Sequence, residues 1–111
     1  MISSNRARRA TVKARTTATR AARRITRRGV GTLATHCLAV GLTPRDARTV
    51  AGSLRRNAAK AGIAGTVGRT FRKGAARACT RFTRAAVALI AALYRPRKQE
   101  FKTAAARLTT A

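Results

Sequence analysis

The segment "TPRDARTVAGSLRRNAAKAG", residues 43–62, gives the clearest structural signal in the chain. Thr43 followed by Pro44 is typical of a helix start, because the threonine hydroxyl accepts a hydrogen bond from a free amide of the first turn and proline has no amide to leave unpaired there. Asp46 follows in the first turn, where the helix dipole favours a negative charge. The segment therefore predicts an α-helix over residues 44–61.

This predicted helix has two unlike faces. Placed at about 100° per residue, its apolar side chains cluster within about 100° of the helical wheel. They are Ala47, Val50, Ala51, Leu54, Ala58 and Ala61. The opposite side carries Arg45, Arg48, Arg55, Arg56 and Lys60. We expect the apolar face to pack on a core and the basic face to meet solvent or an anionic partner.

Downstream, the glycine-rich segment "GIAGTVG" (62–68) ends the helix and predicts a flexible connection. A phosphate-cradling loop of the Walker type would continue with Gly-Lys-Ser or Gly-Lys-Thr, whereas "RTF" follows here. We therefore expect no nucleotide-binding loop at this position.

The next stretch, "RTFRKGAARACTRF" (69–82), predicts a second amphipathic helix. One side of it would hold Phe71, Ala75, Ala78, Cys79 and Phe82. The other side would hold Arg69, Lys73, Arg77, Arg81 and Arg84, with Arg72 at the margin. Gly74 inside the stretch costs a helix roughly 1 kcal/mol relative to Ala. We expect one face in the core and one cationic face without any acidic residue.

The C-terminal part predicts two further helices. Thr83 is placed to cap a helix in "TRAAVALIAALYR", whose apolar residues are distributed nearly all round, as in a helix central to a core. Pro96 ends it, and "QEFKTAAARLTTA" predicts a last helix anchored by Phe101 and Leu108. The uncharged run "AAVALIAALY" is about half as long as a membrane-spanning helix, so we expect no transmembrane segment.

Upstream, residues 1–28 form a basic arm without any acidic residue. Its last part has two faces at helical spacing. They are Arg20, Arg23, Arg24, Arg27 and Arg28 on one side, and Ala18, Ala21, Ala22 and Ile25 on the other. Because the arginines repel one another, we expect the arm to be disordered alone and helical against phosphates. An organellar transit peptide has a similar composition and stays open as a minor alternative.

The order of predicted elements gives an all-α fold. After the basic arm, residues 29–111 are expected to form one compact domain, a small bundle of four to five helices that begins with a short helix carrying Leu33 and Cys37. A helix-turn-helix arrangement is compatible with this order, with residues 44–61 followed by 67–82 as the recognition helix. The connection between these two is longer and richer in glycine than the usual tight turn.

The charge balance indicates a polyanionic partner. Only Asp46 and Glu100 are acidic against 26 Lys and Arg, so the net charge of +24 over 111 residues cannot be neutralised within the chain. Binding a polyanion relieves the repulsion and releases condensed counterions. Of the basic residues 21 are Arg, whose planar fork holds phosphate in a bidentate way. The abundance of Ala, also 26 residues, means that a GC-rich genome accounts for part of the Arg excess.

Residues suited to catalysis or metal binding are scarce. His36, Cys37 and Cys79 are the only histidine and cysteines, and no CxxC or HxxxH pair accompanies them. We therefore expect no enzymatic activity, no metal site, no cofactor and no small-molecule substrate. Both cysteines are expected to be small buried side chains in a reducing compartment.

A nucleic-acid-binding function explains the charge, the arginine-rich faces and the basic arm together. Duplex DNA is favoured over single strands, because Tyr94 and the three Phe residues mostly fall on predicted core faces and leave no platform for base stacking. DNA is also preferred over RNA as the partner. Asn57 is the only Asn or Gln on the two central predicted helices, which favours phosphate contacts over base readout. The predicted contacts are Arg20, Arg23, Arg24, Arg27, Arg28, Arg45, Arg48, Arg55, Arg56, Lys60, Arg69, Arg72, Lys73, Arg77, Arg81 and Arg84.

Two other functions stay open. A ribosome-associated or rRNA-binding protein shares the Arg-Ala composition and the basic tail. A membrane-active protein with cationic helices is less favoured, because the apolar faces are mostly Ala and the chain has no Trp. The sequence does not fix the oligomeric state.

Two segments carry a resemblance to known proteins. "GLTPRDARTVAGSLRRNAAKAG" (41–62) and "FTRAAVALIAALYRPRKQEF" (82–101) resemble parts of small basic proteins carried by actinobacterial plasmids, integrative elements and phages. The resemblance implies a bacterial cytoplasmic, nucleoid-associated setting and a role in handling DNA. It implies no activity for any single residue.

Overall fold

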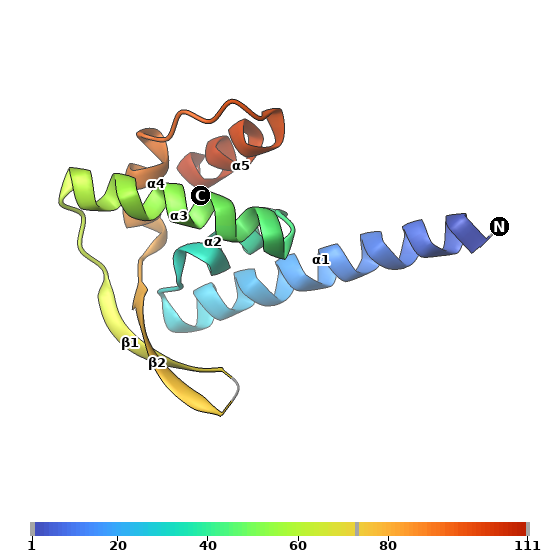
Figure 1. Ribbon diagram of the computed structural model, residues 1–111, viewed down its shortest axis with the longest axis horizontal. Coiled ribbons are helices and arrows are strands. Elements are labelled where there is room, and N and C mark those ends of the chain that lie inside the picture. Colours follow the sequence, from blue (N-terminus) through green and yellow to red (C-terminus); the bar gives the residue numbers. More distant parts are fainter. Residues whose placement is uncertain (1, 73, 111) are drawn as a thin grey trace.

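The computed structural model describes residues 2–72 and 74–110, and the side chains of residues 5–70 and 74–110. Within these ranges the chain forms five helices and one β-hairpin. In chain order they are α1 (Ile2–Arg28), α2 (Leu33–Ala39), α3 (Pro44–Ala61), β1 (Thr66–Arg72), β2 (Ala75–Arg81), α4 (Arg84–Ala92) and α5 (Gln99–Thr110). Helices α2 to α5 gather into a helical body, from which α1 and the hairpin project in different directions (Figure 1).

Helix α3 forms where its capping signals predict it. The Thr43 hydroxyl accepts a hydrogen bond from the amide of Asp46 at 3.2 Å, and Pro44 is the first helical residue. The buried side chains are Ala47, Val50, Ala51, Leu54 and Ala58. The apolar face of α3 is thus confirmed, except that Ala61 in the last turn is exposed.

The core joins α2, α3, α4 and α5. Its largest fully buried side chains include Leu54 of α3 and Ile90 of α4, which pack with Leu33 and Cys37 of α2 and Leu108 of α5. Phe101 is only half-buried and packs against this core from its edge. The short helix around Cys37 and the last helix anchored by Leu108 are therefore confirmed.

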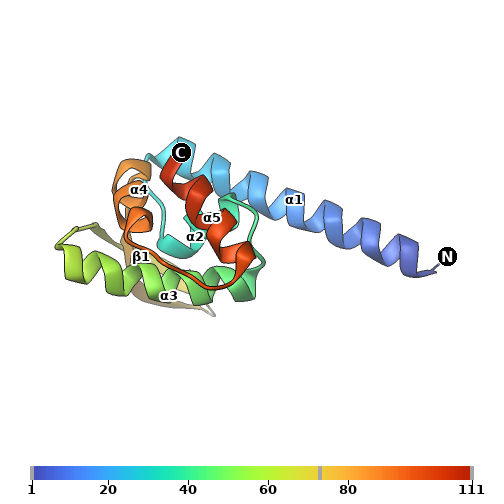
Figure 2. The same cartoon turned by 90° about the horizontal axis from the view of Figure 1, so that it is seen from above.

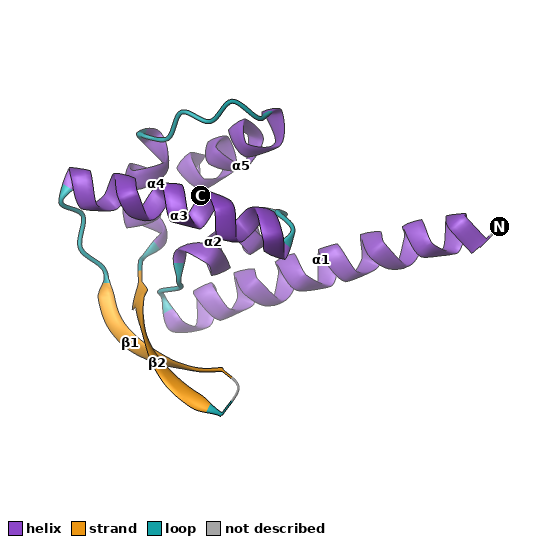
Figure 3. Cartoon of the chain, in the orientation of Figure 1, coloured by secondary structure: helices purple, strands orange, loops and turns teal. Residues whose placement is uncertain are grey.

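The prediction of a helix over residues 69–82, and with it the all-α fold class, is wrong. The segment forms the antiparallel hairpin β1–β2, in which Thr66 pairs with Arg81 and Arg72 pairs with Ala75 (Figure 3). The turn contains Gly74 at a φ of 76°, a left-handed conformation that non-glycine residues rarely adopt. The fold is mostly helical with one two-stranded sheet, and the proposed recognition helix at 67–82 does not exist.

The predicted core face of that segment is dispersed along the hairpin. Ala75 and Ala78 are exposed and Cys79 is half-buried, so only Phe82 among the described members is a core residue. The side chain of Phe71 lies outside the described residues. Because side chains alternate along a strand, the helical grouping of these positions has no counterpart in the structure.

A compact set of contacts anchors the base of the hairpin to the helical body. Phe82 is 6 % exposed and pairs with Gly31, through Phe82 N to Gly31 O at 2.8 Å and Gly31 N to Phe82 O at 3.0 Å. The His36 Nε2 atom lies 2.8 Å from the same Phe82 oxygen. Because a carbonyl oxygen can only accept, His36 Nε2 carries the hydrogen and donates it.

The basic arm is a helix in this structure. The 27 residues of α1 make an element about 40 Å long, and Figure 2 shows it extending well beyond the helical body. Ala21 and Ile25 are buried, as the helical spacing predicts, and they lie in the part of α1 that packs against α2. Residues 5–16 are exposed throughout.

Helix α4 begins where Thr83 predicts it, with the Thr83 hydroxyl accepting from the amide of Ala86 at 3.2 Å. The expectation that α4 is apolar and buried nearly all round is only partly right. Val87 and Ile90 are buried, whereas Leu89 and Leu93 are 64 % and 53 % exposed. One side of α4 therefore faces solvent.

Candidate nucleic-acid interface

The two elements that project from the helical body concentrate the positive charge. Helix α1 carries ten Arg and Lys residues and the hairpin segment 66–81 carries five, which is 15 of the 26 in the chain. Neither contains an acidic residue, since Asp46 lies at the start of α3 and Glu100 on α5. The net charge on each projecting element is therefore uncompensated by its own residues.

On α1 the predicted arginine face is intact. The side chains of Arg20, Arg23, Arg24 and Arg27 line one shallow depression of about 290 Å³. They are exposed, while Ala21 and Ile25 on the other side of the helix are buried. Arg28 lies one turn after Arg24, nearer the hairpin.

On α3 the five predicted basic residues are exposed: Arg45, Arg48, Arg55, Arg56 and Lys60. Arg55 also lines a groove of about 490 Å³ between α3 and the hairpin, together with Ala58, Val67 and Thr80. Arg56 donates to the hydroxyl of Ser53 at 3.2 Å, which holds its guanidinium near the helix surface. Helix α2 contacts both α1 and α3 and lies between them (Figure 2).

The hairpin divides the cationic residues that a helix would have kept together. The pairing register puts Thr70, Arg77 and Arg81 on one face of the sheet and Val67 with Arg69 on the other. Arg81 and Thr70 share a pocket with arginines of α1, whereas Val67 faces the groove beside α3. Lys73 lies outside the described residues, as does the side chain of Arg72.

Hydrogen bonds hold two arginines near the base of the hairpin. The Arg81 Nη2 donates to the carbonyl of Arg69 at 3.0 Å. Arg84, at the start of α4, donates to the Thr26 hydroxyl of α1 at 2.9 Å, so this side chain ties α4 to α1. Sequence reasoning missed both interactions, because they depend on the strand register and on how α1 packs.

The titratable side chains of the core stay neutral near pH 7. Burial lowers the pKa of His36 from 6.5, and the nearby positive charge of Arg84 adds to the shift, while hydrogen bonds at the Phe82 and Gly31 backbone act in the other direction. Burial raises the pKa of Cys37 to about 12, which keeps it a thiol. Among residues 2–72 and 74–110, no three His, Cys, Asp or Glu side chains come together as metal ligands would.

The three aromatic side chains that the structure describes offer little flat surface to a nucleic-acid base. Phe82 is buried, and Tyr94 and Phe101 are half-buried against the core. The ring of Phe101 is in addition covered by Lys98, whose Nζ lies 5.3 Å from the ring centre. Contacts from this surface would therefore come mainly from guanidinium groups and backbone.

No helix in the described part of the chain is both long enough and apolar enough to cross a membrane. Exposed basic side chains lie on α1, α3 and the hairpin. A comparison with protein-family models, with curated proteins and with solved structures finds no match to this chain.

Proposed function

We propose that the protein binds duplex nucleic acid, DNA in preference to RNA, mainly through its phosphates. The observation that carries this proposal is the concentration of 15 of the 26 basic residues on two projecting elements that contain no acid. Counterion release from a polyanion rewards such a surface in proportion to the phosphates that it neutralises. A globular protein selected for solubility alone mixes charges of both signs.

The shape of the molecule supports the same proposal. Helix α1 and the hairpin leave the helical body at a wide angle, so that a rod-like ligand between them would meet basic side chains from both (Figure 1). Helices α2 and α3 are joined by four residues, 40–43, which is the loop length of a helix-turn-helix unit. In this pair α3 would be the helix that contacts the duplex, with its exposed arginines on the phosphates.

Base readout and lipid binding have less support. The described Tyr and Phe side chains are largely covered, which disfavours stacking on unpaired bases. The exposed arm residues 5–16 include one large apolar side chain, Val12, too little to insert a helix into a lipid surface. Phosphate contact, guided by the shape of the duplex, is the mode that remains.

The test is the salt dependence of binding to a fluorescent DNA duplex, measured by anisotropy from 50 to 200 mM salt. With six to ten phosphates neutralised, affinity should fall by about 10³–10⁵ over this range. The double variant Arg23→Gln with Arg27→Gln should bind more weakly, and the slope of log affinity against log salt should shrink by about 0.9 for each phosphate that is no longer neutralised.

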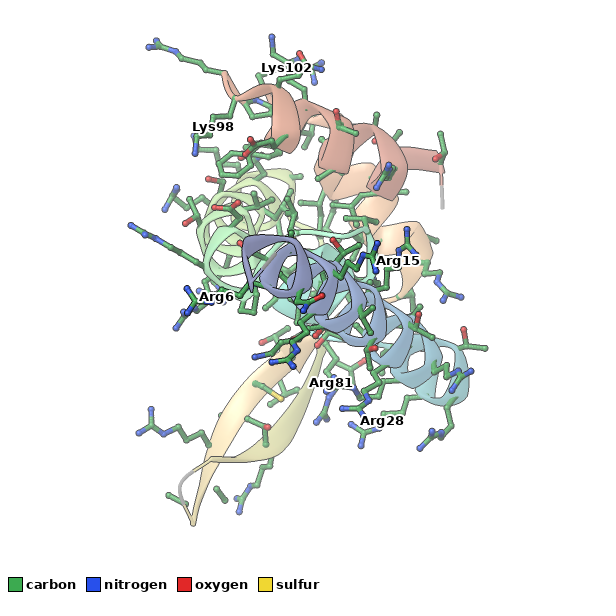
Figure 4. The ribbon with its side chains drawn as sticks, turned by 90° about the vertical axis from the view of Figure 1, so that its right-hand side faces the viewer. Arg6, Arg15, Arg28, Arg81, Lys98 and Lys102 are labelled. Carbon is green, nitrogen blue, oxygen red and sulfur yellow. The ribbon has the colours of Figure 1, made fainter. Side chains whose placement is uncertain are left out.

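The matched control is Lys98→Gln with Lys102→Gln, which removes the same charge from the opposite side of the molecule, away from Arg28 and Arg81 (Figure 4). It should leave the slope unchanged. A flat salt response, or equal losses in the two double variants, would contradict the proposal. Tighter binding to an RNA duplex of the same sequence would favour the rRNA-binding alternative, and dye release from anionic vesicles the membrane-active one.

A further inference from the structure

We propose that a small pocket at the base of the hairpin binds one phosphodiester group of the DNA backbone. The inference rests on the proposed DNA-binding function and assigns one phosphate of the duplex to one site. The pocket has a volume of about 120 Å³ and lies between the end of α1, the start of α2 and the hairpin. Its polar side chains are Arg24, Arg28, Arg81, Thr32, Thr35 and Thr70.

Three guanidinium groups from two separate elements line this pocket. Arg24 and Arg28 come from α1, one helical turn apart, and Arg81 comes from β2. Figure 4 shows Arg28 and Arg81 near each other at the hairpin base. No carboxylate lines the pocket, so the three charges repel one another until an anion enters. Phosphate oxygens suit this arrangement because each can accept charge-assisted hydrogen bonds from more than one guanidinium.

Arg81 is held in position before any ligand binds. Its side chain is half-buried and donates from Nη2 to the Arg69 carbonyl at 3.0 Å. It also lies against Gly68 on the neighbouring strand, where a Cβ would collide with Arg81 Nη1. Ordering the side chain in advance lowers the entropy lost on binding.

The threonines supply a neutral donor beside these charges. The Thr32 hydroxyl accepts from the Thr35 amide at 3.2 Å and lies 2.8 Å from the Thr35 hydroxyl. When Thr32 donates its own hydrogen to Thr35, the Thr35 hydroxyl hydrogen is left for an acceptor in the pocket. A phosphate oxygen can fill that role.

The size of the pocket sets the ligand class. Its volume of about 120 Å³ corresponds to about four water molecules at ~30 Å³ each, which suits a phosphate group and is too small for a whole nucleoside. A phosphate held here would contact α1 and the hairpin at once. It would therefore fix how the two projecting elements lie along a duplex, which is the positioning role of backbone contacts.

The first test compares two single-charge variants on the same face of the hairpin. Arg81→Gln removes a pocket residue, and Arg77→Gln removes an equal charge that lies outside the pocket. Arg81→Gln should weaken binding to a DNA duplex by at least about tenfold, as expected when hydrogen bonds to a charged group are removed. Arg77→Gln should cost only about two- to fivefold, as for a solvent-exposed charge. Equal losses would overturn the assignment.

The second test keeps the charge constant. Gly68→Ala should displace the Arg81 guanidinium while the net charge stays at +24, so the salt slope should shrink by up to about 0.9 without any change in charge. Gly52→Ala on α3 is the control, because its Cβ meets nothing closer than Arg56 Nη1 at 4.0 Å. Amide resonances of Thr66 and Thr80 report whether the hairpin is intact. An unchanged slope with an intact hairpin contradicts the proposal.

The third test separates a backbone phosphate from a free one. The Arg81 Nε–H resonance is followed by NMR during titration with a DNA duplex and, separately, with inorganic phosphate. A large shift with the duplex, together with the Arg81→Gln loss, supports the assignment. A shift with inorganic phosphate while Arg81→Gln binds DNA normally would show a free-phosphate site and overturn it. If the Arg81 resonance of the wild-type protein shifts with inorganic phosphate but the protein does not bind DNA, both the proposed DNA-binding function and the assignment of the pocket to a backbone phosphodiester are overturned.

Discussion

Helix α3 and the hairpin segment 66–81 have similar compositions, but they form different secondary structures that are stabilised in different ways. Each carries five basic residues along with several Ala. Helix α3 buries five side chains in the core, whereas no described residue of the hairpin strands is fully buried. The hairpin is instead held by its backbone pairing and by the anchor at Phe82. Composition alone therefore does not decide which secondary structure an Arg-Ala segment adopts.

The difference also bears on how each element can serve binding. A two-stranded hairpin without a buried face is marginally stable, so the hairpin should open locally while the helical body stays folded. Helix α3 should open only when the whole domain unfolds. A surface on α3 is thus rigid before binding, and the hairpin can adjust to a ligand around its fixed base.

The largest expected effect comes from removing a buried side chain of α3. Leu54 is fully buried, and Leu54→Ala should cost about 2–5 kcal/mol of unfolding free energy and lower Tm by about 10–30 °C. Val67 of β1 is 77 % exposed, so Val67→Ala should change stability by no more than about 0.5 kcal/mol. Thermal melts followed by circular dichroism measure both, and similar losses would mean that the hairpin shares the core.

Two glycine substitutions should change the stability of the protein in opposite directions. Gly52→Ala in α3 should stabilise the domain by about 0.5–1 kcal/mol, because Ala is the better helix residue and the site has room for a Cβ. Gly74→Ala in the turn should destabilise the hairpin by about 1–2 kcal/mol, because φ is 76° there.

The Gly74→Ala effect should stay local. Hydrogen exchange of the β1 and β2 amides should speed up by a factor of about 5–30, while the amides of α3 keep their protection. Uniform acceleration across the domain would show that the hairpin and the helical body unfold as one unit, and that α3 and the hairpin do not differ in stability.

How far the sequence predicts this molecule depends on whether the decisive signals are local. Thr43 and Thr83 fix helix starts by accepting hydrogen bonds from amides three positions away, Pro44 is the first residue of α3, and all three predictions hold. The hairpin depends on Gly74 adopting a left-handed turn and on Phe82 pairing with Gly31, 51 positions earlier. High helix propensity of Ala and Arg favours the wrong answer locally, and the tertiary anchor overrides it.

The candidate interface also has one part that local sequence spacing predicts and one part that depends on the tertiary structure. The arginine face of α1 follows from spacing alone, and the structure keeps Ala21 and Ile25 on the buried side. The pocket at the hairpin base does not follow from spacing, because it needs the register that brings Arg81 over Gly68 and the packing that brings Arg24 near Thr35. The one local indication of the hairpin is Gly74, a residue typical of turns, which follows the β-branched residues Thr66, Val67 and Thr70.

The smallest expected effect is a pH dependence carried by His36, which connects the helical body to the hairpin through Phe82. Burial lowers the pKa of His36 in the folded protein below 6.5, its ordinary value. As pH falls through 6.5, the unfolded chain therefore binds a proton that the folded protein does not, and stability decreases until the pH reaches the folded pKa. Urea unfolding at pH 7.5 and 5.5 should show a lower midpoint at pH 5.5.

The matched variant is His36→Gln, whose amide can still donate to the Phe82 carbonyl but does not titrate. Its midpoint should change less between pH 7.5 and 5.5 than that of the wild type. Since His36 donates to the hairpin base, the amides of Gly31 and Phe82 should lose protection on acidification before those of α3. A midpoint that rises toward pH 5.5, or an equal change in the variant, would mean that the charge on His36 does not govern this anchor.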